Sequence, residues 1–181
     1  DCRARDRIEQ SDHVHIHGVG TAILVSHCRL TMNYWLIKSE PSTYSIDDLQ
    51  RDKTTAWEGV RNYQARNLMR VMKKGDLVLF YHSSSDPMGV AGIARVHTDP
   101  HPDMSQFKQG DYFEPRATKA APVWDCVDVA FVAKAKHVVS LASLKAEKKL
   151  ADMVLMQRGS RLSVQPVTPE QFAHIRTLLE A

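Results

Sequence analysis

The sequence lacks several features that define common protein classes. It has only three cysteines in 181 residues, Cys2, Cys28 and Cys126, and no two of them form a CxxC pair. Neither a disulfide framework nor a cysteine zinc site is therefore indicated, and reduced thiols are the simplest interpretation. No apolar run approaches the roughly 18 residues that a membrane span needs. A Walker phosphate loop and a GxSxG nucleophile elbow are also absent, which removes two common enzyme signatures.

Positive charge is only slightly in excess of negative charge. The chain has 24 Lys and Arg residues against 21 Asp and Glu, a net charge of +3 and a pI near 8.8. A domain that coats phosphates usually has a pI above about 9, so this composition permits nucleic-acid binding without arguing for it. With 43% hydrophobic and 25% charged residues, the chain has the composition of a soluble globular protein. We expect a cytoplasmic monomer that does not associate with membranes.

The first 31 residues differ from the rest. Residues 1–12 mix basic and acidic side chains, and His13, His15 and His17 follow them. The segment has neither the basic start nor the long apolar centre of a secretory signal. The three histidines would share one face of an extended chain as a metal-binding comb, an alternative that lacks a fourth ligand. We expect residues 1–31 to be an extension that precedes one domain over residues 32–181.

Patterns after residue 32 predict alternating strands and helices. We expect strands at 33–38, 77–81, 90–96, 125–135 and 163–167. We expect helices after a capping box at Ser45, at 62–72, at 140–148, and after Thr168 with Pro169 in the first turn. Residues 99–123 indicate a long loop, either a lid or a disordered excursion, in which Phe107, Tyr112 and Phe113 suggest some packing. The fold class is α+β, and a small, mostly antiparallel β-barrel flanked by short helices would bury these strands.

The stretch from Trp57 to Arg66 is the most informative for chemistry. Within ten residues it contains Trp57, Arg61, Asn62, Tyr63 and Arg66. An aromatic plane, two guanidinium groups and an amide can hold a flat, hydrogen-bonding ring. The alternative is an amphipathic helix whose aromatic residues pack inward, and the spacing alone favours that alternative.

Polar residues also follow two of the predicted strands. Lys38–Pro41 ends the first strand, and Tyr81–Ser83 ends the strand at 77–81. Functional groups often lie at such strand ends, although each stretch taken alone is more typical of a surface turn or a structural histidine. Residues 157–166 contain two arginines, which would either lie near phosphates or form a turn between a helix and a strand.

Taken together, these stretches match a family pattern. Five blocks carry the match: Tyr34–Pro41, Trp57–Asn67, Gly75–His82, Gly89–Ala94 and Leu162–Val167. In this order and spacing the chain resembles the EVE domain family from Met32 to about Leu179. The resemblance implies a PUA-like pseudobarrel and a non-catalytic module that recognises a modified base of DNA or RNA. In the PUA-like superfamily, a pocket between the barrel and a flanking helix receives the base.

The resemblance also implies which residues form the pocket. The base-binding residues would be Trp35, Lys38, Ser39, Trp57, Val60, Asn62, Tyr63, Tyr81, His82 and Ser83. The rim or phosphate contacts would be Glu40, Arg61, Arg66 and Gln157. The base would stack on Trp57 or Tyr81. No catalytic residue, metal or cofactor is expected.

An enzyme is the main alternative. The ASCH family shares the PUA-like barrel, and some of its members are amidohydrolases that act on modified nucleosides. Lys38 and Glu40 are two positions apart and would face the same way in an extended strand. A desolvated lysine beside a carboxylate can act as a base, although a surface ion pair is the simpler interpretation. A partner-binding role for the same aromatic surface is a further alternative.

Overall fold

The computed structural model describes residues 32–159 and 161–181. The expected extension over residues 1–31, with its row of histidines, lies outside the described residues, so both stay predictions. Among the helices that are described, none has the length and apolar character that crossing a membrane requires.

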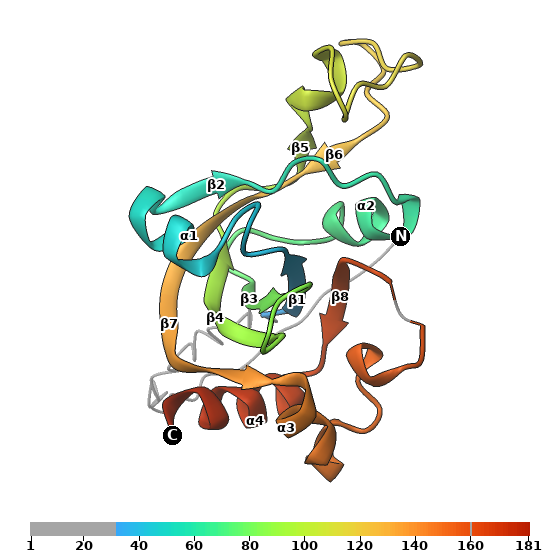
Figure 1. Cartoon of the computed structure of the whole chain (residues 1–181). Coiled ribbons are helices and arrows are strands. Elements are labelled where there is room, and N and C mark those ends of the chain that lie inside the picture. Colours follow the sequence, from blue (N-terminus) through green and yellow to red (C-terminus); the bar gives the residue numbers. More distant parts are fainter. Residues whose placement is uncertain (1–31, 160) are drawn as a thin grey trace, which may run out of the picture. The chain divides into compact units, whose positions relative to one another are not determined.

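A curled six-stranded sheet, a half-barrel, forms the centre of the fold (Figure 1). Its order is β2-β7-β4-β3-β1-β8, in which β1 and β3 are parallel and the other neighbours are antiparallel. The strands are β1 (Tyr34–Ser39), β2 (Thr54–Ala56), β3 (Leu77–His82), β4 (Gly89–Val96), β7 (Asp128–Ser140) and β8 (Val164–Val167). A separate two-stranded sheet pairs β5 (His101–Pro102) with β6 (Asp125–Cys126). The expected α+β class with a mostly antiparallel, barrel-like sheet is confirmed.

Short helices connect and cover the strands. They are α1 (Ile46–Asp52), α2 (Tyr63–Met69), α3 (Leu141–Ala146) and α4 (Pro169–Glu180), with 3₁₀ turns η1 (Met104–Phe107), η2 (Lys148–Leu150) and η3 (Val154–Met156). The two predicted helix starts at Ser45 and Thr168 are confirmed, because each residue forms a complete capping box. α2 ends three residues before the expected Met72, because the chain continues there in tighter turns with i to i−3 bonds.

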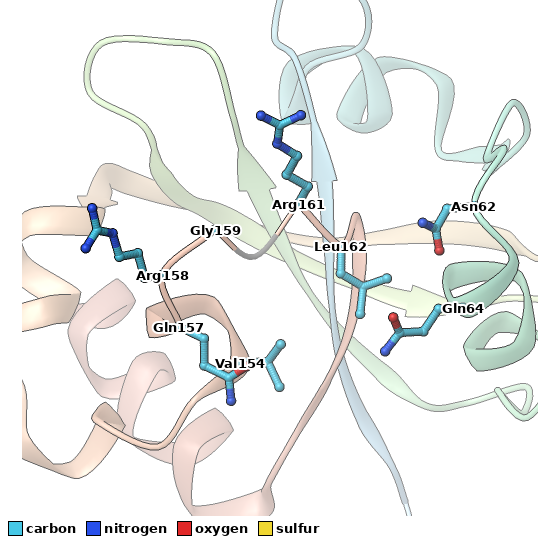
Figure 2. A pocket seen from close by; sticks show the side chains of 8 residues that line it. All are labelled: Asn62, Gln64, Val154, Gln157, Arg158, Gly159, Arg161 and Leu162. Atoms are coloured by element: carbon cyan, nitrogen blue, oxygen red, sulfur yellow. The ribbon is translucent and has the colours of Figure 1, made fainter.

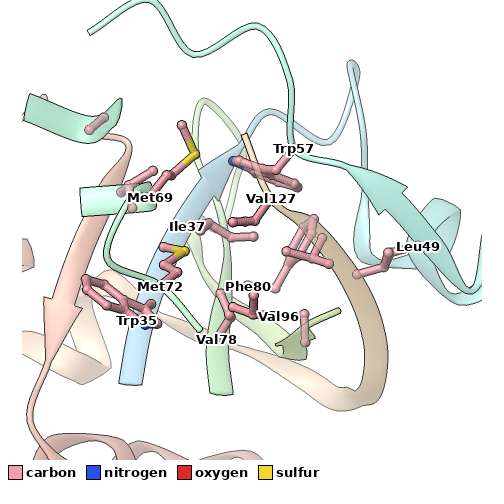
Figure 3. Packing of buried hydrophobic residues seen from close by; sticks show 14 of the residues in the cluster. Trp35, Ile37, Leu49, Trp57, Met69, Met72, Val78, Phe80, Val96 and Val127 are labelled. Atoms are coloured by element: carbon pink, nitrogen blue, oxygen red, sulfur yellow. The ribbon is translucent and has the colours of Figure 1, made fainter. Parts of the chain in front are cut away.

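Both faces of the sheet are packed with apolar side chains. Trp35 and Ile37 of β1 join one core cluster, shown in Figure 3, while Leu36 between them joins the other. This alternation follows from the period of two in a strand. The second cluster includes Ile175 of α4 and Leu144 of α3. The helices α3 and α4 therefore cover one face, and the other face carries the site described below.

The sheet curls where β4 meets β7. A Cβ atom on Gly92 would lie 2.4 Å from the carbonyl oxygen of Ala133 and 2.9 Å from a side-chain carbon of Ile46. Register shifts occur on both sides of Gly92, between Val90 and Gly92 and between Ile93 and Ala94. Bulges bend a strand and increase its twist, so this close approach lets β7 wrap around the sheet and reach β2.

The buried side-chain amide of Gln106 holds the long segment at 99–123 in place. Gln106 donates to the backbone oxygens of Asp103 and Trp124, both at 2.7 Å. Its Oε1 accepts from the backbone N–H groups of Val123 and Trp124, both at 2.9 Å. Four hydrogen bonds thus tie the two ends of the segment together at its base. The part beyond this base projects above β5 and β6 in Figure 1.

Candidate functional site

A cavity of about 640 Å³ opens between the end of β1 and the segment that joins β2 to α2. Volumes of about 300–1,000 Å³ are typical of small-molecule sites. The cavity is lined by Lys38, Ser39, Glu40, Thr43, Tyr44, Thr55, Ala56, Trp57, Glu58, Gly59, Val60, Arg61, Tyr112 and Ser163. Six of the residues named from the sequence are in this lining: Lys38, Ser39, Trp57 and Val60 of the predicted pocket, and Glu40 and Arg61 of the rim.

The side chains of three other predicted pocket residues are buried and make contacts within the protein. The buried indole N–H of Trp35 donates to Asp76 Oδ2 at 2.9 Å. Tyr81 is buried in the cluster on the opposite face of the sheet. His82 is buried as well, and its Nε2 accepts from the backbone N–H of Ile46 at 3.1 Å, at the start of α1. Burial lowers the pKa of His82 from 6.5, which favours the neutral ring that this bond requires.

The three remaining residues of the predicted pocket also lie outside the lining of this cavity. Asn62 caps α2, because its Oδ1 accepts from Ala65 N–H at 2.9 Å. Tyr63 stacks on Trp124 with ring centroids 4.7 Å apart. Ser83 donates its hydroxyl to a backbone oxygen at the end of β1, at 3.2 Å.

Two of the predicted rim residues lie apart from this cavity. Arg66 donates to Val123 O at 2.9 Å and lies 4.8 Å from the centroid of the Tyr63 ring. Gln157 lines a second cavity, described below. A base-binding or phosphate-binding role for these residues stays a prediction.

Arg61 is held in a network at the cavity rim. Its Nη1 lies 2.8 Å from Asp103 Oδ2 and its Nη2 lies 3.0 Å from Ser105 Oγ. Its Nε donates to the backbone oxygen of Tyr112 at 3.0 Å, and the guanidinium lies 5.3 Å from the centroid of that ring. Burial raises the pKa of Asp103, but the hydrogen bonds from Arg61 and Ser105 outweigh it and lower the pKa overall. Arg61 therefore joins the projecting segment to the β2–α2 connection.

Tyr112 is the most informative residue that was not assigned to the pocket from the sequence. Its side chain is 45% exposed and lies against Gly59, where an added Cβ would come 2.8 Å from the ring. Gly59 has a φ of +79°, a conformation that side-chain-bearing residues rarely adopt. The only signal in the sequence was an aromatic residue within a polar segment, and nothing local identified Gly59, 53 positions earlier, as its partner.

Lys38 is the lysine of the lining. Its Nζ lies 5.9 Å from the centroid of the Tyr81 ring, and burial lowers its pKa below the usual 10.5. The neighbouring Ser39 hydroxyl donates to Tyr44 O at 2.7 Å, and Glu40 accepts from the Ser84 hydroxyl at 3.0 Å. The cavity thus combines a cation, carboxylates, hydroxyls and aromatic rings, which are groups suited to a flat ligand with both donors and acceptors.

A second cavity of about 360 Å³ lies beside the first. Figure 2 shows its lining, which consists of Asn62, Gln64, Val154, Gln157, Arg158, Gly159, Arg161 and Leu162. Two residues that line it are adjacent in sequence to residues that line the first cavity: Asn62 follows Arg61, and Leu162 precedes Ser163. Across residues 32–159 and 161–181, no group of three His, Cys, Asp or Glu side chains is arranged to hold a metal ion.

Comparisons with known proteins place the chain in a family. Residues 33–178 match the model described as the EVE domain. Human thymocyte nuclear protein 1 is 40% identical over 168 residues, which cover 82% of this chain and 74% of that protein. A hypothetical protein from Leishmania major is 48% identical with a TM-score of 0.79, covering 82% of this chain and 95% of that one.

Human THYN1 has also been solved in complex with DNA that contains 5-methylcytosine. That structure is 39% identical to this chain with a TM-score of 0.77, and the match covers 82% of this chain and 98% of the human one. Because the family model spans most of the sequence and the relatives agree at this level of identity, the chain belongs to the EVE domain family.

Proposed function

We propose that this chain binds a modified nucleic-acid base in the 640 Å³ cavity and does so without catalysis. The observation that carries the proposal is the complex of human THYN1 with DNA containing 5-methylcytosine, because that chain has the same fold and 39% identity. The cavity supports it with a suitable volume and lining. Methylated cytosine in DNA is therefore the first ligand to test, and RNA is the second.

The lining is suited to the edge of a cytosine ring. The exocyclic amine of cytosine donates to carboxylates, and Glu58 supplies one. The ring acceptors can receive a hydrogen bond from the Lys38 ammonium. A 5-methyl group needs apolar contact, which Ala56 and Val60 offer. Because cations and carboxylates both line the cavity, it favours a neutral polar ligand over a polyanion.

Stacking is best supplied by Tyr112. Trp57 is only 8% exposed, and its ring meets Phe80 edge-on at 5.5 Å, so little of its face is accessible. Tyr112 has 45% of its surface exposed at the mouth of the cavity. Stacking on an aromatic side chain contributes roughly 1–3 kcal/mol per base. A base must leave its stack to enter, which costs a few kcal/mol in a duplex, so we expect tighter binding to single strands or mismatched sites.

The test is a titration by fluorescence anisotropy. The probes are matched single-stranded and duplex oligonucleotides with cytosine, 5-methylcytosine, 5-hydroxymethylcytosine or N6-methyladenine at one position. The proposal expects tighter binding of one modified base than of its plain counterpart. Replacing Lys38 by Met should weaken binding of the plain and the methylated cytosine probes several-fold, whereas the matched control Lys148→Met, at an exposed lysine on η2, should not change it. Equal affinity for all probes would overturn the proposal.

One observation favours the hydrolase alternative enough to include it in the test. Lys38 and Glu40 line the same cavity, and burial lowers the pKa of Lys38, as a general base requires. Glu40, however, is exposed and accepts from Ser84. Incubation with N4-acylated cytidine followed by chromatography would reveal released cytidine. Release that is lost in Lys38→Met would establish an enzyme in place of a binding module.

A further inference from the structure

We propose that the second cavity, here called the arginine groove, holds the sugar–phosphate backbone of the strand whose base enters the first cavity. The arginine groove is lined by the eight residues labelled in Figure 2, which include Arg158 and Arg161. This inference rests on the proposed function and adds to it the part of the ligand that lies outside the base.

The charge of the groove has one sign. Among the residues that the structure describes, its lining includes two guanidinium groups, Arg158 and Arg161, and no carboxylate. Both side chains are exposed, and within the described part of the chain neither forms an ion pair with a carboxylate. Arg61, by contrast, is bound to Asp103. The two groove arginines can therefore bind an incoming anion without first breaking an ion pair with a carboxylate of the described residues.

Amides complete the lining with further donors. Oδ1 of Asn62 accepts from Ala65, and the two N–H donors of the same amide can bind a ligand in the groove. Gln64 and Gln157 are exposed and add two more amides from α2 and from the loop after η3. Guanidinium and amide N–H groups are the usual partners of phosphate and sugar oxygens.

The position of the groove matches the path of a strand. Arg61 lines the base cavity and the next residue, Asn62, lines the groove; Ser163 and Leu162 repeat this relation on the other wall. Consecutive Cα atoms are only about 3.8 Å apart. A base in the first cavity would therefore have its own backbone near the groove. Figure 2 shows Asn62 and Gln64 on one side of the opening and Gln157 on the other, with Arg158 and Arg161 extending outward.

The experiment compares two double variants with equal loss of charge. Arg158→Gln/Arg161→Gln changes the groove, and Lys148→Gln/Lys149→Gln changes two exposed lysines of η2. Binding to 5-methylcytosine and cytosine oligonucleotides is measured at several salt concentrations. Each lost phosphate contact lowers the slope of log K against log salt by about 0.7 for a single strand or 0.9 for a duplex. We expect the groove variant to bind about 10-fold more weakly at low salt and to lose between one and two units of slope.

Two further results separate the groove from the base cavity. The ratio of affinities for methylated and plain oligonucleotides should be the same in the groove variant as in the unchanged protein. The free nucleoside 5-methyl-2′-deoxycytidine, which has no phosphate, should bind both proteins equally. Because all four replaced side chains are exposed, circular dichroism should show unchanged melting of both variants.

The outcomes distinguish this inference from the proposed function. If the groove variant and the lysine variant lose the same affinity and slope, the arginine groove does not bind the backbone, even where a preference for the methylated base persists. If the groove variant loses slope while no protein prefers a modified base, the groove is supported and the base reader is not. A change in base preference without a change in slope would overturn the groove as a backbone site.

Discussion

The two ends of the parallel pair β1–β3 differ in what their residues do. Before the strands begin, Asp76 Oδ1 accepts from the backbone of Asn33 at 3.0 Å, and its Oδ2 accepts from Trp35 and from Lys73 N–H. Where the strands end, Lys38 faces a cavity of about 640 Å³. Both ends lie within the family's signature blocks. A signature block can therefore mark a hydrogen-bond network that holds the fold as easily as a surface that binds a ligand.

The largest expected effect separates the two ends by stability. Replacing Asp76 by Ala leaves the buried indole N–H of Trp35 and two backbone N–H groups without their acceptor. Buried donors without a partner cost about 1–3 kcal/mol each, so we expect the free energy of unfolding to fall by about 3–5 kcal/mol. Urea denaturation measures it. The control Asp99→Ala removes an exposed carboxylate with one long contact, at 3.4 Å, and should change stability by less than about 0.5 kcal/mol. If Asp76→Ala and Asp99→Ala lowered the free energy of unfolding equally, the Asp76 network would have no special role in stability.

A smaller effect is expected in binding alone. Tyr112→Ala removes the exposed ring at the cavity mouth, and the loss of one stacking partner weakens base binding by about 1–3 kcal/mol. Stability should stay within about 1 kcal/mol, because the ring is at the surface. The neighbouring Phe113 is 39% exposed and outside the lining, so Phe113→Ala is the matched control in the same anisotropy assay. A loss of affinity in Phe113→Ala equal to that in Tyr112→Ala would place the stacking surface elsewhere.

The smallest effect concerns pH. Burial lowers the pKa of His82 below 6.5, with Lys134 adding to the shift and Asp47 opposing it. As pH falls below about 6.5, the unfolded chain takes up a proton that the folded chain resists, so this residue makes folding less favourable. At higher pH the ring is neutral in both states and the loss disappears.

The measurement for His82 is the pH dependence of urea denaturation between pH 5 and 7.5. His82→Gln keeps an acceptor for Ile46 N–H but cannot titrate, so its stability should fall less over that range than that of the unchanged protein. Parallel pH curves for the two proteins would show that His82 does not contribute.

Features determined by short stretches could be predicted from the sequence. The capping boxes at Ser45 and Thr168 and the alternation in β1 involve residues within four positions of each other, so their physical cause lies within a single window. β2 was not predicted, because its three residues are too short to show a period and it forms only against β7.

The candidate site was harder to predict for the same reason. The resemblance identified Lys38 and Trp57, which line the cavity, but did not separate them from Trp35 and His82, whose polar groups are already bonded. That separation depends on Asp76 and Ile46, residues 41 and 36 positions away in the chain. Tyr112 was not assigned to the pocket because its partner Gly59 is more remote still, 53 positions away.

The projecting segment that carries Tyr112 has an evolutionary consequence. Gln106 closes its base with four hydrogen bonds. Glu114 is held by Arg116 and Trp124, and its backbone N–H donates to Gln106 O at 3.0 Å. The sequence between these two anchors can diverge without repacking the sheet. One wall of the cavity can thus change its chemistry through mutation while the scaffold that presents it is inherited unaltered, which gives a lineage a route to new ligand preferences within a single fold.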